Sequence, residues 1–219
     1  MESIRDTISL FGTYLPLVIF FLYLSVLIRH TPLRSIRFFV LYFGCIASLQ
    51  IFNQIYIKFD LGNNNHFLSH FYFISQLIAL SGFYYFLFNP LQKKVVITVT
   101  SSVLLVLLVQ FWLYPEKLLK FNLLEVVLCS LPLIGYSIVH LYNSLTYSKR
   151  FALINAGVLI YLSTSALIFL LANKILLSGE RDFALNIWNI NNTLYLGYLI
   201  LIMVEWIKNR KQWIRKKQL

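Results

Sequence analysis

Charged residues are scarce in this chain of 219 residues, because Asp, Glu, Lys and Arg together make up only 12% of it. Soluble domains carry about 25% charged residues, so this chain has too little polar surface to cover a water-soluble globule. Hydrophobic residues make up 59% and come in blocks of about 20, long enough to cross a hydrocarbon layer of about 30 Å. The sequence therefore predicts an all-α integral membrane bundle.

Cysteine is nearly absent, which argues against a disulfide framework or a metal-thiolate site. The two cysteines, Cys45 and Cys129, lie within apolar blocks rather than in polar loops. A cleaved signal peptide is also not indicated. Residues 1–6 carry two acids and one base, and no small-residue cleavage site follows the apolar run. The first block is therefore interpreted as a retained membrane span.

Several motifs of membrane enzymes and pigments are missing. The last span has no Schiff-base lysine for retinal, because Lys208 lies beyond the membrane edge. The only aspartates, Asp6, Asp60 and Asp182, do not form the pair that an aspartyl protease needs, and no HExxH or Gly-rich phosphate loop occurs. No pattern here calls for catalysis, and we expect no cofactor.

Seven apolar blocks predict seven transmembrane helices. They cover residues 9–28, 38–57, 67–88, 95–114, 122–142, 151–172 and 183–207. The connectors between them are short and polar, so none holds a soluble domain. We expect one transmembrane domain over residues 1–207, followed by a basic cytoplasmic tail over residues 208–219.

The basic residues predict the orientation, since cytoplasmic loops carry an excess of Lys and Arg. Counted over alternate ends of the spans, 13 lie on the side of the tail and six on the other side. This places the N-terminus outside and the C-terminus in the cytoplasm. The net charge of +11 lies mostly at the ends of apolar blocks, which favours lipid headgroups over nucleic acid as its partner.

Polar side chains inside the spans are costly, and here they gather in the half of the bundle predicted to face outside. Such a group suits an outward-open pocket for a small neutral ligand or a lipid. The candidate ligand-binding residues are Gln50, Asn53, Gln54, His70, Gln76, Glu125, Trp188, Asn189, Asn191, Asn192 and Tyr195. The alternative is that these groups bond one another and hold the helices together.

Glu125 and the histidines allow two further hypotheses. Glu125 is the better functional acid of the spans, able to meet a cationic or hydroxyl group or to carry a proton. His66 and His70 have the i, i+4 spacing that places two imidazoles on one metal, with Glu125 or Asp182 as third ligand. Two histidines at a span boundary are more often interfacial residues, so we predict no metal site.

The end of the chain is both basic and aromatic. Trp206 and Trp213 recur at heptad spacing among Lys and Arg, which indicates an amphipathic helix on the inner leaflet. The alternatives are a topology anchor at the interface or a docking site for a cytoplasmic protein. The candidate membrane-surface residues are Trp206, Lys208, Arg210, Lys211, Trp213, Arg215, Lys216 and Lys217.

Two segments carry a resemblance to known proteins, GVLIYLSTSALIFLLAN at 157–173 and WNINNTLYLGYLILIMVEW at 188–206. They resemble small bacterial seven-helix membrane proteins and the seven-helix sensory modules found with histidine kinases. The resemblance implies a bacterial inner-membrane protein with a sensing or accessory role. Without a kinase domain of its own, such a module acts through a separate membrane or cytoplasmic partner protein.

Two other functions compete with this interpretation. One is a small solute carrier, because the sequence shows signs of an internal repeat. Four residues of one block match four of another at a constant offset: Arg37, Phe38, Gly44 and Leu49 match Arg150, Phe151, Gly157 and Leu162. This hints at three helices, a linker helix and three more helices, which looks like the sugar-transporting SWEET and PQ-loop family, although no Pro-Gln dipeptide occurs. The other is an oligomeric pore-type effector.

Overall fold

The computed structural model describes residues 2–29, 34–62, 64–146, 151–177 and 181–215. Within these ranges, only the backbone is described for residues 2–6, 9, 29, 146, 173–177, 181–186 and 211–215. The described residues form seven α-helices, with a short 3₁₀-helix, η1 (Pro115–Leu119), between the fourth and the fifth. The helices are α1 (Glu2–Arg29), α2 (Arg34–Lys58), α3 (Phe67–Tyr85), α4 (Pro90–Leu113), α5 (Leu123–Thr146), α6 (Ala152–Leu177) and α7 (Arg181–Arg215).

The prediction of an all-α bundle of seven helices is confirmed, and each predicted block overlaps one helix, although the block 67–88 runs three residues past the end of α3. Helix ends follow local backbone chemistry rather than the end of the apolar run. At α4, the Asn89 side chain accepts a hydrogen bond from the Gln92 backbone N–H at 2.9 Å, and the Gln92 side chain accepts from Asn89 N–H at 3.3 Å. This capping box, with Pro90 as the first helical residue, starts α4 before the apolar block at Val95.

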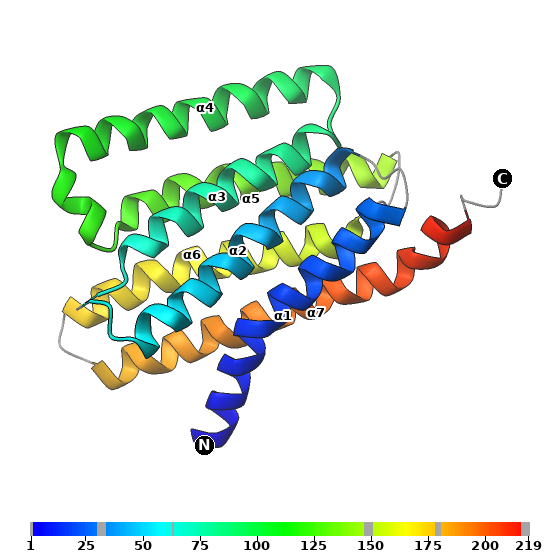
Figure 1. Cartoon of the computed structure of the whole chain (residues 1–219). Helices are drawn as coiled ribbons and strands as arrows, with labels where there is room; N and C mark the ends of the chain where they lie inside the picture. Colours follow the sequence, from blue (N-terminus) through cyan, green and yellow to red (C-terminus); the bar gives the residue numbers. More distant parts are fainter. Residues whose placement is uncertain (1, 30–33, 63, 147–150, 178–180, 216–219) are drawn as a thin grey trace.

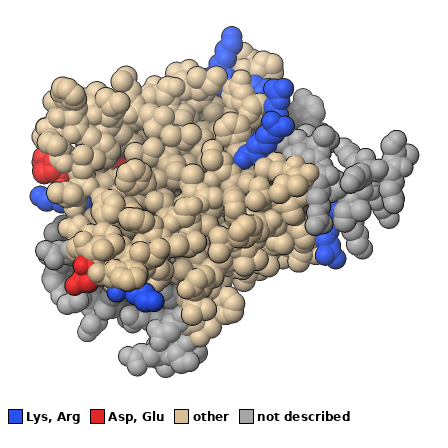
Figure 2. Space-filling model, in the orientation of Figure 1, with Lys and Arg blue, Asp and Glu red and all other residues tan. Residues whose placement is uncertain are grey.

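Six of the seven helices are long and apolar enough to cross a membrane: α1, α2, α4, α5, α6 and α7. The helix outside this group is α3, because His70, Gln76 and three serines dilute its apolar residues. Helix α3 nevertheless runs alongside α2, α4 and α5, which shield it (Figure 1). On the face of the molecule that Figure 2 shows, charged side chains gather towards the two ends, and the surface between them is almost free of charge.

The helices form two facing rows, α1–α2–α3 and α7–α6–α5. Each helix contacts its neighbour in the row, and contacts of α1 with α7 and of α3 with α5 join the rows at both edges. Helix α4 packs outside this ring, against α3 and α5, along the upper edge of the bundle in Figure 1. The six helices other than α4 therefore form a closed ring.

The bundle has two distinct ends. Helices α2, α4 and α6 finish, and α3, α5 and α7 begin, at one end, which we name the α2–α3 end (Figure 1). The opposite end, where α7 finishes, is named the tail end. In the predicted topology the α2–α3 end faces outside.

Aromatic rings over glycines let neighbouring helices approach closely. A Cβ at Gly82 of α3 would lie 2.1 Å from the ring of Phe38 on α2, and one at Gly157 of α6 would lie 2.8 Å from Tyr198 on α7. Small residues at helix contacts are a general device of membrane bundles, where packing rather than hydrophobicity joins helices. The two rows are therefore close-packed, and the polar groups between them have fixed positions.

Candidate functional site

A hollow of about 300 Å³ lies between the two rows near the α2–α3 end. We name it the tyrosine hollow, because three tyrosines contribute to its wall. Its lining residues come from α2, α3, the connection before α5, α6 and α7: Gln50, Ser69, Tyr72, Phe73, Phe121, Tyr161, Phe169, Trp188, Asn191, Asn192 and Tyr195. Residues far apart in the sequence thus share one concave site.

A second hollow of about 340 Å³ adjoins the first and shares Gln50, Ser69 and Tyr72 with it. We name it the loop hollow, since Asn65 and His66 from the α2–α3 connection also line it. The Asn65 amide donates a hydrogen bond to the Asn53 side chain at 2.6 Å, which ties this connection to α2. The two hollows together form a recess between the α2–α3 connection and the space between the rows.

Stacked aromatic rings lie beside the tyrosine hollow. The rings of Tyr161 and Tyr198 stack at 5.2 Å with an interplanar angle of 6°, and Tyr195 lies 5.3 Å from Tyr161. Gln50 donates a hydrogen bond to the Tyr195 hydroxyl at 3.4 Å, which joins α2 to α7 across the ring of helices. These three rings belong to the buried core and pack α6 against α7 beside the hollow.

The lining of the tyrosine hollow is uncharged and combines a few polar groups with a larger apolar surface. No described residue that lines it carries a charge, and its polar groups are amides, hydroxyls and one indole. Asn191 is 6% exposed, and its side-chain oxygen has no hydrogen-bond partner among the described residues. A buried acceptor without a partner costs about 1–3 kcal/mol. A ligand that donates a hydrogen bond to Asn191 would remove that cost.

The sequence-predicted ligand-binding residues divide into three groups. Gln50, Trp188, Asn191, Asn192 and Tyr195 line the tyrosine hollow, and Asn53 lines the loop hollow beside Gln50. Gln54 and Asn189 line neither hollow. The Gln54 amide points to the Thr13 hydroxyl at 3.5 Å, and Asn189 accepts a hydrogen bond from Thr193 through its backbone.

The third group is buried between helices, outside both hollows. It consists of Gln76, His70 and Glu125. The Gln76 amide donates to the Tyr42 hydroxyl at 3.3 Å, from α3 to α2.

His70 and Glu125 form a buried hydrogen-bonded pair between α3 and α5, through His70 Nδ1 and Glu125 Oε2. Both residues are at most 5% exposed, and the His70 ring meets the Phe111 ring of α4 edge-on at 5.2 Å. The outer atoms of the pair, His70 Nε2 and Glu125 Oε1, have no described partner. The pair therefore joins the helices that meet beneath α4, and it does not line either hollow.

The described residues contain no group of three His, Cys, Asp or Glu side chains that could hold a metal ion. His66 lines the loop hollow, whereas His70 is bonded to Glu125. The two imidazoles therefore do not face a common site. The Asp182 side chain lies outside the described residues.

Asn155 is the centre of a second polar cluster, nearer the tail end, that sequence reasoning missed. Its side-chain oxygen accepts hydrogen bonds from the Tyr84 and Ser137 hydroxyls, each at 2.9 Å, and its amide donates to the Ser137 carbonyl at 3.1 Å. This cluster joins α3, α5 and α6. Polar side chains therefore also gather around Asn155, and not only in the half of the bundle predicted to face outside.

Tyrosines were the other omission, since only Tyr195 was a candidate. Tyr72 and Tyr161 line the tyrosine hollow, and Tyr42 and Tyr198 lie beside it. Tyrosine is common where spans meet headgroups, so its presence in a span predicts little by itself. The signal that could have found them is their position along the helix, because Tyr42 and Tyr161 lie well away from the ends of their helices.

The candidate membrane-surface residues are only partly described. The Trp206 indole turns inward and donates a hydrogen bond to the Leu22 carbonyl of α1 at 3.0 Å, and the Arg210 guanidinium lies 5.9 Å from its ring. Lys208 is exposed. The side chains of Lys211, Trp213 and Arg215, and all of Lys216 and Lys217, lie outside the described residues.

Searches of family models, of curated proteins and of solved structures find no match for this chain. The fold by itself defines a class. With six helices long and apolar enough to cross a bilayer, the chain is a multi-pass α-helical membrane protein in contact with lipid.

Proposed function

We propose that this protein recognises a small neutral polar ligand in the tyrosine hollow and passes that signal to a separate partner protein. In this proposal all seven helices, α3 included, cross the inner membrane of a bacterium with the N-terminus outside. Residues 1–207 form the membrane domain and residues 208–219 a basic cytoplasmic tail. The α2–α3 end then faces outside, where a ligand reaches the hollow without crossing the bilayer.

The observation that carries the proposal is the uncharged lining of the tyrosine hollow, in which polar groups lie among aromatic rings. Amides and hydroxyls from facing helices surround its space, and the buried Asn191 oxygen there still lacks a donor. Rings of Trp188 and Tyr161 supply flat apolar faces beside these polar groups. Such a lining suits a polyol, sugar or amide, and about 300 Å³ is at the small end of ligand sites.

The proposal is tested by ligand binding to the purified protein in mild detergent. The probes are a panel of neutral polyols, monosaccharides and small amides, and the readout is the fluorescence of Trp188, which lies in the hollow. We expect at least one probe to change the fluorescence saturably. The Trp188→Phe variant should lose that change and still bind the same probe in a thermal-shift assay.

A matched pair of variants distinguishes an effect on the hollow from an effect on helix α7. Asn192 lines the hollow, and its neighbour Thr193 is exposed and lines neither hollow. We expect Asn192→Leu to lose the bound probe and Thr193→Leu to keep it. If both variants bind equally, or if no neutral probe binds the wild type, the proposal fails.

The partner is tested separately, by mass spectrometry of proteins that copurify with the chain from its native membrane. A stoichiometric partner whose association changes with the bound probe supports the sensory role. A chain that purifies alone, with or without the probe, contradicts that role and leaves the ligand site to another function.

A solute carrier is the second candidate, and the helix arrangement favours it. The triplets α1–α2–α3 and α5–α6–α7 occupy equivalent places in the ring, and α4, the expected linker, lies outside it. A parallel repeat of three helices has this pattern of contacts. Proteoliposomes decide between the two functions, because a carrier moves the bound probe with saturable kinetics and a sensor binds it without flux.

A further inference from the structure

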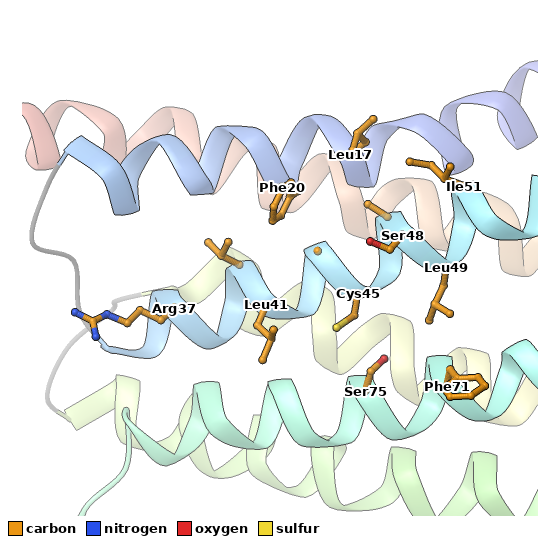
Figure 3. A pocket seen from close by; sticks show the side chains of 13 residues that line it. Leu17, Phe20, Arg37, Leu41, Cys45, Ser48, Leu49, Ile51, Phe71 and Ser75 are labelled. Atoms are coloured by element: carbon orange, nitrogen blue, oxygen red, sulfur yellow. The ribbon is translucent and has the colours of Figure 1, made fainter.

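The outer surface of the row α1–α2–α3 contains the largest of the three hollows described here, with a volume of about 660 Å³. We name it the α2 recess, since α2 forms its floor. Leu17 and Phe20 of α1 form one wall, and Phe71 and Ser75 of α3 form the other (Figure 3). It lies on the opposite face of the row from the tyrosine hollow and shares no lining residue with it.

Small residues on one face of α2 create this recess. Gly44, Ala47 and Ser48 follow the i, i+3, i+4 pattern that places side chains on one side of a helix, and Cys45 lies three residues before Ser48. Phe20 packs over Gly44 so closely that a Cβ there would lie 3.1 Å from its ring, which brings α1 against α2. The surface of α2 is consequently set back between the larger side chains of α1 and α3.

A single charge lies at the tail end of the α2 recess. Arg37 lines it, is exposed, and makes no ion pair with any described residue. Figure 3 shows Arg37 at one end of the recess, with Ile51 and Phe71 at the other. From Arg37 to Ile51 the helix rises over 14 residues, or about 21 Å. The recess is thus apolar over more than half of a hydrocarbon core of about 30 Å and cationic at one membrane surface.

This combination matches one membrane component. We propose that the α2 recess binds one anionic phospholipid, with an acyl chain along α2 and the phosphate on the Arg37 guanidinium. The apolar length fits the chain, and the unpaired guanidinium complements an anionic headgroup. A zwitterionic lipid fits the apolar part equally well but brings no net charge to Arg37.

Native mass spectrometry of the delipidated protein, titrated with phosphatidylglycerol or phosphatidylcholine, tests this site. We expect phosphatidylglycerol to be retained in preference, with one tight binding event. Arg37→Gln should reduce that retention about fivefold, the effect of one basic residue at an anionic membrane surface. The matched control is Arg34→Gln, since Arg34 is exposed near the same helix end and does not line the recess.

A second variant tests the apolar part without touching the charge. Ser48→Trp fills the recess and should lower the retention of both lipids, and a thermal melt shows whether the variant is folded. Equal retention of the two lipids by the wild type, or equal losses in the Arg37 and Arg34 variants, would overturn the site and leave only annular lipid. Probe binding in the tyrosine hollow should be unchanged in Arg37→Gln, so this test is independent of the proposed function.

Discussion

The polar residues at the α2–α3 end surround a hollow, whereas those around Asn155 bond one another across three helices. Asn155 makes four hydrogen bonds with Tyr84 and Ser137, each 3.1 Å or shorter. Around the tyrosine hollow, the bond from Gln50 to Tyr195 is long at 3.4 Å, and the Asn191 oxygen has no described partner. Two sets of similar side chains therefore have different roles.

This difference shows which polar groups hold the bundle together. A buried polar group in a membrane protein costs little stability when its hydrogen bonds are complete within the protein, as they are at Asn155. An incomplete set beside an open space costs stability. Under the proposed function, the ligand completes that set. The comparison predicts that variants in the bonded clusters lose stability, whereas variants in the hollow lose binding.

The largest loss of stability is expected at the buried pair of His70 and Glu125. His70→Phe leaves the Glu125 carboxyl without its partner between α3 and α5, which should lower the free energy of unfolding by about 3 kcal/mol. Unfolding in mixed micelles, followed by circular dichroism, measures it. The double variant His70→Phe/Glu125→Leu should recover more than half of the loss, because no carboxyl is left stranded. No recovery would show that the pair contributes only by packing.

The next largest effect is expected at Asn155. Asn155→Leu keeps the volume but removes the acceptor of the Tyr84 and Ser137 hydroxyls, which should cost about 2 kcal/mol. Thr164→Val on the same helix is the control, because Thr164 is only half-buried and its hydroxyl bonds to its own helix. Similar losses in the two variants would contradict the structural role of Asn155.

A smaller effect is expected at Glu205. Its carboxylate accepts a hydrogen bond from the Leu153 backbone N–H at 2.9 Å and also contacts the Asn209 amide, so it satisfies the first turn of α6. Glu205→Gln keeps an acceptor but removes the charge at the helix N-terminus, which should cost about 0.5–1 kcal/mol. Thermal melting resolves such a change, and a cost equal to that of Asn155→Leu would contradict this ranking.

The smallest effect on stability is expected in the hollow itself. Asn192 is exposed and makes no side-chain hydrogen bond to the described residues, so Asn192→Leu should change the free energy of unfolding by less than about 0.5 kcal/mol. The same melts measure this variant. A loss as large as that of Asn155→Leu would place Asn192 in the structural group.

The fold could be predicted from the sequence to a large extent, because apolar blocks long enough to cross a bilayer have few alternatives to helices. The contacts between the helices could not. His70 and Glu125 come from different blocks, and nothing in their spacing indicates that α3 meets α5 outside the hollow. Asn192 and Trp188 could be predicted as site residues, since amides beside an aromatic at the start of a span indicate a polar site. Tyr72 and Tyr161 could not, because tyrosine is also common at membrane surfaces.

The central claim is that the tyrosine hollow is open to the outside and the Asn155 cluster is closed. It is tested most directly by the reaction of single-cysteine variants, in a background without Cys45 and Cys129, with a membrane-impermeant maleimide added to intact cells or right-side-out vesicles. We predict that Asn192→Cys reacts rapidly and that Ser137→Cys reacts only after denaturation. An Asn192→Cys variant that reacts only after the membrane is opened, or equal reaction of both variants, would contradict the account.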